Sequence, residues 1–180
     1  LEGVEANDDA RAELGRAAMD AALPDACVAG YQRLIAALTL PDLAMARQVT
    51  LTTKLNDYGG DGAYLAFYVT NAQGAYVGSL WMAGGKSRYH EHLRDWYRAT
   101  GGDPAQINGI TGASVGSGRT LKVTLDLADA LFDAGYTLHI DAAVENMRES
   151  PNEIAVPLTT SGAGTAVHGR HYIASFTYAM

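Results

Sequence analysis

Residues 120–127 have the sequence Thr-Leu-Lys-Val-Thr-Leu-Asp-Leu, and this stretch decides the fold class. Apolar side chains occupy every second position, while threonine, lysine and aspartate occupy the positions between them. Because successive side chains of a strand point to opposite faces, the pattern predicts a strand with one face in a core and the other in water.

The same alternation recurs both before and after this stretch. An Asn-Ala-Gln-Gly sequence at 71–74 predicts the turn of a hairpin between two of the apolar runs. The predicted strands are Val49–Leu55, Tyr64–Val69, Tyr76–Met82, Leu121–Leu127, Tyr136–Val144, Ile154–Leu158 and Tyr172–Tyr178. Seven short strands joined by Gly-rich turns indicate a mainly β protein, and we expect an immunoglobulin-like β-sandwich.

Helical periodicity occurs in two parts of the chain. Between residues 87 and 100, Tyr89, Leu93, Trp96 and Tyr97 share one helical face, which predicts a short α-helix lying over the sandwich. Residues 1–43 are rich in Ala and Leu, with a Pro-Asp break at 24–25, and predict a two-helix N-terminal extension. The predicted domains are therefore a helical extension, 1–43, and a β-sandwich, 44–180.

Composition excludes several classes of function. The net charge of -7 and the scattered Lys and Arg residues argue against nucleic acid as a partner. No apolar run approaches the roughly 18 residues that a membrane span needs. Cys27 is the single cysteine, so an intramolecular disulfide or a redox pair of cysteines is excluded, and we expect a buried, inert thiol.

The predicted loop between residues 101 and 118 contains the most informative motif, Asn108-Gly-Ile-Thr-Gly-Ala-Ser114. Two hydroxyl side chains flank Gly112 and Ala113, and nearby glycines free the backbone, so such a segment can enter another enzyme's active site. The motif resembles the flavinylation motif Asp-x-x-Ser/Thr-Gly-Ala-Thr, in which the last hydroxyl receives FMN. Asn108 stands where that motif has Asp, Thr111 where it has Ser or Thr, and Ser114 where it has Thr.

The resemblance extends over roughly residues 47–180, to a family of predicted periplasmic proteins of unknown function. Genes of that family often accompany PepSY-type membrane proteins and flavin transferases of the ApbE type. The resemblance rests on Tyr64–Val69, Asn71–Gly74, Leu80, Trp81, Lys86, Tyr89, Leu93, Arg94, Trp96, Ile110–Ser114 and Tyr136–His139.

The resemblance implies an extracytoplasmic electron carrier, with FMN joined through a phosphoester to Ser114 by an ApbE-type transferase and with a PepSY-type membrane protein as partner. It implies a periplasmic location, the signal peptide being absent from this chain, and no catalytic residue or metal of its own. Trp81, Tyr89, Trp96 and Tyr97 would wall the flavin ring, and Lys86, Arg88 or Arg119 would meet the phosphate. The expected cofactor-binding residues are Ser114, Thr111, Gly112, Ala113, Asn108, Trp81, Trp96, Tyr89 and Lys86.

Other interpretations remain open from sequence. The motif also fits an unmodified Gly-rich turn, which would leave a non-catalytic periplasmic binding or assembly module without cofactor. Trp81 and Trp96 have the spacing of core residues. His168 and His171 lie in a Gly-rich turn, where they would capture a small ligand or metal or simply be solvated. His90 and His92 point about 200° apart on a helix and cannot chelate a metal together there.

Overall fold

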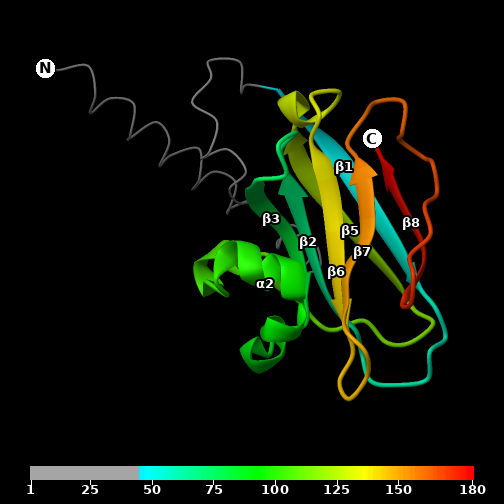
Figure 1. The fold of residues 1–180 in the computed structure, drawn as a ribbon. Helices are drawn as coiled ribbons and strands as arrows, with labels where there is room; N and C mark the ends of the chain where they lie inside the picture. The colour runs from blue at the N-terminus through cyan, green and yellow to red at the C-terminus, as the bar shows by residue number, and fades with distance from the viewer. Residues whose placement is uncertain (1–44) are drawn as a thin grey trace, which may run out of the picture.

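The structure is a computed structural model that describes residues 45–180. Two β-sheets pack face to face, and a short helical segment lies against the larger sheet (Figure 1). The predicted N-terminal helices and Cys27 lie outside the described residues. None of the helices in the described part of the chain is long and apolar enough to cross a lipid bilayer.

The smaller sheet has three antiparallel strands in the order β5-β1-β8. They are β1 (Ala46–Leu55), β5 (Thr120–Ala128) and β8 (Ile173–Ala179). The alternating stretch at 120–127 forms β5, where Val123, Leu125 and Leu127 are buried and the intervening polar residues are exposed. The period of two therefore gave the correct inward face.

The larger sheet has five strands in the order β4-β3-β2-β6-β7. They are β2 (Tyr64–Thr70), β3 (Tyr76–Ala83), β4 (Thr111–Gly112), β6 (Thr137–Ala143) and β7 (Ser150–Pro157). β2 is buried on both faces because its alternate residues enter two different apolar clusters. Leu65, Phe67 and Val69 join the core between the sheets, and Tyr64, Ala66 and Tyr68 face the helical segment.

The prediction of a mainly β protein with two packed sheets and a short helix is confirmed, and each of the seven predicted strands forms. The short helix predicted between residues 87 and 100 is present, but it is not continuous. It is divided into a 3-10 helix, η3 (Ser87–His92), and an α-helix, α2 (Arg94–Thr100). Leu93 separates them with φ -85° and ψ 73°, and its fully buried side chain belongs to the same apolar cluster as Trp96.

The predicted loop at 101–118 is more ordered than the sequence suggested. It contains a 3-10 helix, η4 (Pro104–Ile107), and the edge strand β4, and an isolated bridge then joins Val115 to Ala63. A last 3-10 turn, η5 (Asp129–Leu131), follows β5. The motif is therefore built onto the edge of the larger sheet.

Candidate functional site

The backbone of the motif is fixed on both sides of its serine. Before it, Met82 N donates to the Ile110 carbonyl at 2.9 Å and Gly84 N donates to the Gly112 carbonyl at 2.8 Å. After it, Val115 and Ala63 exchange two backbone hydrogen bonds of 2.7 and 3.0 Å. Residues 113 and 114 thus form a short span between two anchored points, which holds the serine at a defined place.

The two hydroxyls of the motif have different surroundings. Thr111 is half-buried, and its hydroxyl donates to the Ile107 carbonyl at 2.9 Å. Ser114 is exposed, as are Ala113 and Asn108. Ser114 is therefore open to solvent, whereas the Thr111 hydroxyl is engaged in holding the motif together.

The register of the bridge shows which face of the sheet carries Ser114. Ala63 pairs with Val115, and both side chains enter the core between the sheets. In an antiparallel pair the adjacent residues lie opposite each other and point to the other face. Ser114 therefore points to the outer face, which also carries the helical segment, and its side chain lies against Gly62.

Gly62 leaves space for the Ser114 side chain. A Cβ atom at position 62 would lie 2.6 Å from Ser114 Oγ and 3.1 Å from Ser114 Cβ, inside van der Waals contact. Gly112 leaves space in the same way, since a Cβ there would lie 2.7 Å from Cζ2 of Trp81. Both glycines permit close approach at the sheet edge, one beneath the serine and one against the indole.

A groove of about 510 Å³ is lined by Tyr64, two residues after the Gly62 that the Ser114 side chain contacts. The rings of Tyr64 and Tyr89 are 5.1 Å apart, and the guanidinium of Arg88 lies 4.7 Å from the Tyr89 ring centre. Burial raises the pKa of Tyr64, as does the nearby Tyr89, so its phenol stays protonated at neutral pH. The groove is lined by Tyr64, Tyr89, His92, Ala143, Val144, Glu145, Asn146, Met147, Arg148 and Glu149.

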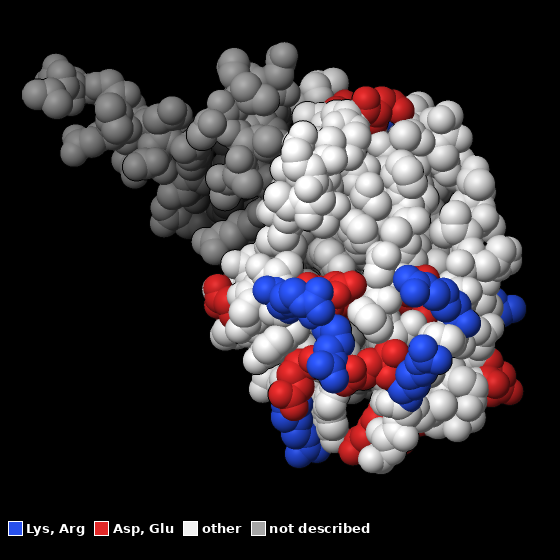
Figure 2. Space-filling model, in the orientation of Figure 1, with Lys and Arg blue, Asp and Glu red and all other residues white. Residues whose placement is uncertain are grey.

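An ion-pair cluster forms one side of this groove. Glu149 accepts from Arg94 Nε and contacts His92 Nδ1 at 2.7 Å. The Arg94 hydrogen bond is the main cause that lowers the pKa of Glu149, opposed in part by burial. Figure 2 shows charges of both signs gathered on the lower half of this face, so the surface has no patch of a single sign there.

The structure places the other predicted cofactor-binding residues in different environments. Tyr89 lines the groove, and Lys86 lies exposed just before η3. Trp81 is half-buried beside Gly112, and its indole nitrogen is buried with no hydrogen-bond partner among residues 45–180. Trp96 is 0% exposed, and its Nε1 donates to Ser79 Oγ at 2.8 Å, which is the core packing that its spacing also suggested.

Sequence reasoning missed Gly62, Tyr64 and the segment 143–149 as parts of the site. Tyr64 was assigned only to a strand, because its phenol reaches the groove through sheet pairing that local pattern does not encode. Gly62 carries a weak signal, since it lies in a Gly-rich stretch just before β2. The hairpin between β6 and β7 carries no sequence signal that would mark it as part of the site.

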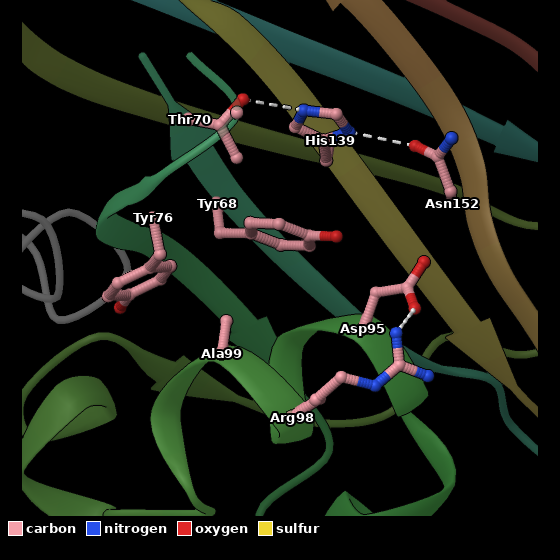
Figure 3. Close-up of a pocket in the computed structure, with 9 residues that line it drawn as sticks. Tyr68, Thr70, Tyr76, Asp95, Arg98, Ala99, His139 and Asn152 are labelled. Carbon is pink, nitrogen blue, oxygen red and sulfur yellow. Dashed lines mark hydrogen bonds and ion pairs between the residues drawn. The ribbon is translucent and has the colours of Figure 1, made fainter.

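A second, smaller hollow lies further along the same outer face (Figure 3). Its volume is about 270 Å³. The His139 ring stacks on Tyr68 with ring centres 5.1 Å apart, and its nitrogens are hydrogen-bonded to Thr70 and Asn152 at 2.9 and 2.8 Å. Asp95 and Arg98 of α2 form an ion pair at its other side.

The buried carboxylate of Asp141, on β6, holds α2 against the larger sheet. Its Oδ2 accepts from the backbone N–H groups of Asp95 and Trp96, both at 2.8 Å, and its Oδ1 accepts from Asn152 N at 2.7 Å. Burial raises the pKa of Asp141, and the N–H groups of Trp96 and Asn152 oppose that shift. Its contacts identify it as a structural cap of α2.

The histidines that invited a metal interpretation are separately engaged. His90 is buried with Nε2 2.8 Å from the Gly84 carbonyl, and His92 contacts Glu149. His168 Nδ1 lies 2.6 Å from the Ala174 carbonyl, and the backbone N–H of His171 donates to Glu153. Across residues 45–180, no group of three potential metal ligands is found.

The fold and the motif together define a β-sandwich protein that presents an exposed serine at the edge of its larger sheet. Residues 46–175 match the DUF2271 family, described as predicted periplasmic proteins, and the chain belongs to this family. The periplasmic location expected from the sequence is confirmed by that membership. No curated protein and no solved structure is detectably similar to the chain.

Proposed function

We propose that the protein is a periplasmic electron carrier in which FMN is attached through a phosphoester to Ser114. The observation that carries the proposal is the exposed Ser114 hydroxyl, held between two anchored backbone points over the space that Gly62 leaves. A flavin supplies reversible electron transfer when bound, and a covalent attachment keeps it from diffusing away.

The attachment chemistry is a nucleophilic displacement at phosphorus. Ser114 Oγ attacks the FMN phosphorus of a flavin dinucleotide, an Oγ–P bond forms, and the P–O bond to the AMP portion breaks. The hydroxyl proton passes to a base of the ApbE-type transferase, and AMP leaves with the electrons of the broken bond. No electron is gained or lost by the flavin, and no oxidant is required.

The surroundings of Ser114 fit a bulky phosphate substituent. The Ser114 oxygen packs over Gly62, where a Cβ would lie 2.6 Å from it, and Lys86 and Arg88 are exposed cations in the segment after β3. The Thr111 hydroxyl is bonded to a backbone carbonyl, which favours Ser114 as the acceptor. Asn108 is exposed at the end of η4, accessible to a recognising enzyme.

The deciding experiment is intact mass spectrometry after co-expression with an ApbE-type flavin transferase. We expect a gain of one FMN less one water in the wild type, no gain in Ser114→Ala, and retained gain in Ser114→Thr. Ser117→Ala is the matched control, because Ser117 lies in the same segment but bonds to Asp57. Absence of the gain, or its persistence in Ser114→Ala, would contradict the proposal and favour a binding module without cofactor.

The same proposal includes the immunoglobulin-like class and a PepSY-type membrane partner. Pairing of β1 with β5, of β2 with β6 and of β6 with β7 follows the pattern of strands B-E, C-F and F-G in immunoglobulin domains. β3 then takes the place of the extra strand beside C, and β8 lies beside β1 where strand A normally pairs. An experimental structure compared with immunoglobulin domains tests the class, and co-purification of the flavinylated protein tests the partner.

A further inference from the structure

The groove beside Ser114 has the position that a flavin ring attached there can reach. Ser114 lies against Gly62, two residues before Tyr64, whose ring forms part of the groove. A Cβ at Gly60 would lie 2.9 Å from Sδ of Met147, which also lines the groove. Two residues of chain span at most about 7 Å, so Gly62 lies within that distance of both Gly60 and Tyr64. The ribityl chain between the phosphate and the ring of FMN is long enough to cover such a separation.

The second hollow is a poorer candidate for the same ring. It is lined by Tyr68 and Thr70, at the end of β2 away from Ser114. Four residues of extended strand separate Tyr68 from Tyr64, which is about 13 Å. Its volume of about 270 Å³ is also below the usual range of small-molecule sites, whereas about 510 Å³ lies within it.

The lining of the larger groove has the chemistry that an isoalloxazine ring needs. Tyr64 and Tyr89 offer aromatic surface, and offset or edge contacts between such rings are favourable. Arg88, stacked on Tyr89, and Arg148 are cations at the groove, and Glu145 and Glu149 are carboxylates of the same lining. The cations would stabilise a reduced, anionic flavin. Met147 adds a polarizable apolar side chain, which tolerates contact with varied ring edges.

The geometry points to the Tyr64–Tyr89 groove as the docking site of the isoalloxazine ring of FMN attached at Ser114. This inference rests on the proposed function, because the ring reaches the groove only through that attachment. Tyr89 is then a positioning residue for the ring, and the hairpin at 144–149 forms the opposite wall. Docking would shield the flavin from water while its attachment point stays at the sheet edge.

Steady-state fluorescence of the flavinylated protein tests the inference, since a tyrosine in contact with a flavin quenches its emission. The reference is the flavinyl peptide released from the same sample by protease. In the wild type we expect weaker emission than the peptide and the anisotropy of a ring that tumbles with the protein. In Tyr89→Leu we expect emission to rise by about twofold or more, with lower anisotropy, as the aromatic contact is lost.

The matched control is Tyr97→Leu, because Tyr97 is an exposed tyrosine of the nearby helix α2 that does not line the groove. Its emission and anisotropy should equal those of the wild type. Full flavin mass with peptide-like emission in the wild type, or unchanged emission and anisotropy in Tyr89→Leu, would overturn the docking site alone. Absence of flavin mass in the wild type would overturn the proposed function and this inference with it.

Discussion

At the scale of single residues, Gly62 controls the space available to the Ser114 oxygen. We predict that Gly62→Ala slows flavin attachment by about tenfold or more, because the new methyl group would lie 2.6 Å from Oγ and force the hydroxyl from its position. The rate is measured from the growth of the modified mass under limiting transferase.

The control for this prediction is Gly85→Ala. Gly85 lies just after β3, and a Cβ there would make an ordinary 3.8 Å contact with Thr111. Its modification rate should match the wild type. Equal rates for Gly62→Ala and Gly85→Ala would show that the space beneath the serine has no role in attachment.

At the scale of elements, Asp141 joins α2 to the larger sheet through its two oxygens. An Asn side chain at this position has only one acceptor oxygen. Its NH2 group would therefore face either the N–H groups of α2 or the Asn152 N–H, and two donors would meet without an acceptor. We predict that Asp141→Asn lowers the free energy of unfolding by about 2 kcal/mol in urea titrations. Asp126→Asn, on the exposed face of β5, should change it by less than about 0.5 kcal/mol.

Glu153 joins β7 to the segment before β8 and gives the protein an acid sensitivity. The side chain is 2% exposed, and its Oε1 accepts from the four successive backbone N–H groups of residues 170–173 at 2.7–3.0 Å. Burial opposes ionisation, but the hydrogen bonds from Ser150 and the backbone outweigh it and lower the pKa of Glu153. The carboxylate is therefore stabilising in its charged form.

The sign of the pH effect follows from that lowered pKa. The contribution of Glu153 is complete above the unfolded value of about 4.3 and is lost as pH falls through the lower folded value. We predict that Glu153→Gln costs about 2–3 kcal/mol at neutral pH and that its unfolding free energy falls less steeply below pH 4 than that of the wild type. Parallel pH profiles for the two proteins would contradict this assignment.

The elements also show what the sequence alone can predict. Strands such as β5 were predictable because a period of two is imposed by burial of one face. The break at Leu93 could not be predicted, because the apolar spacing of residues 89–97 is the same with or without it. The two-residue strand β4 could not be predicted either, because it is defined only by its hydrogen bonds to β3.

The candidate site follows the same division. The motif around Ser114 could be singled out from local sequence, and the structure exposes Ser114 at the sheet edge. The groove was not recognisable, because Tyr64, Tyr89 and residues 143–149 come from three separate parts of the chain. Of the aromatic residues predicted to contact the flavin, Trp96 packs in the core and Tyr89 lines the groove. Helical spacing does not distinguish these two environments.

At the scale of the whole molecule, residues 45–180 form one structural unit with a shared hydrophobic core. The core between the sheets runs from Val49 to Tyr178, so the first and last strands of the described residues both contribute to it. Both sheets, the helical segment and the serine site are built from this range. Such a unit is expected to fold cooperatively.

We therefore predict that a chain beginning at residue 44 folds without residues 1–43 and accepts FMN at Ser114 as the full chain does. Its urea transition should be single and coincide when followed by near-UV and far-UV circular dichroism, because Trp81, Trp96 and the strands belong to one cooperative unit. The full chain, flavinylated under the same conditions, is the control. A truncated chain with native-like far-UV but no near-UV signal would mean that the packing around these aromatic residues depends on the first 43 residues. A truncated chain that folds normally yet gains no FMN, while the full chain does, would instead assign those residues to recognition by the transferase.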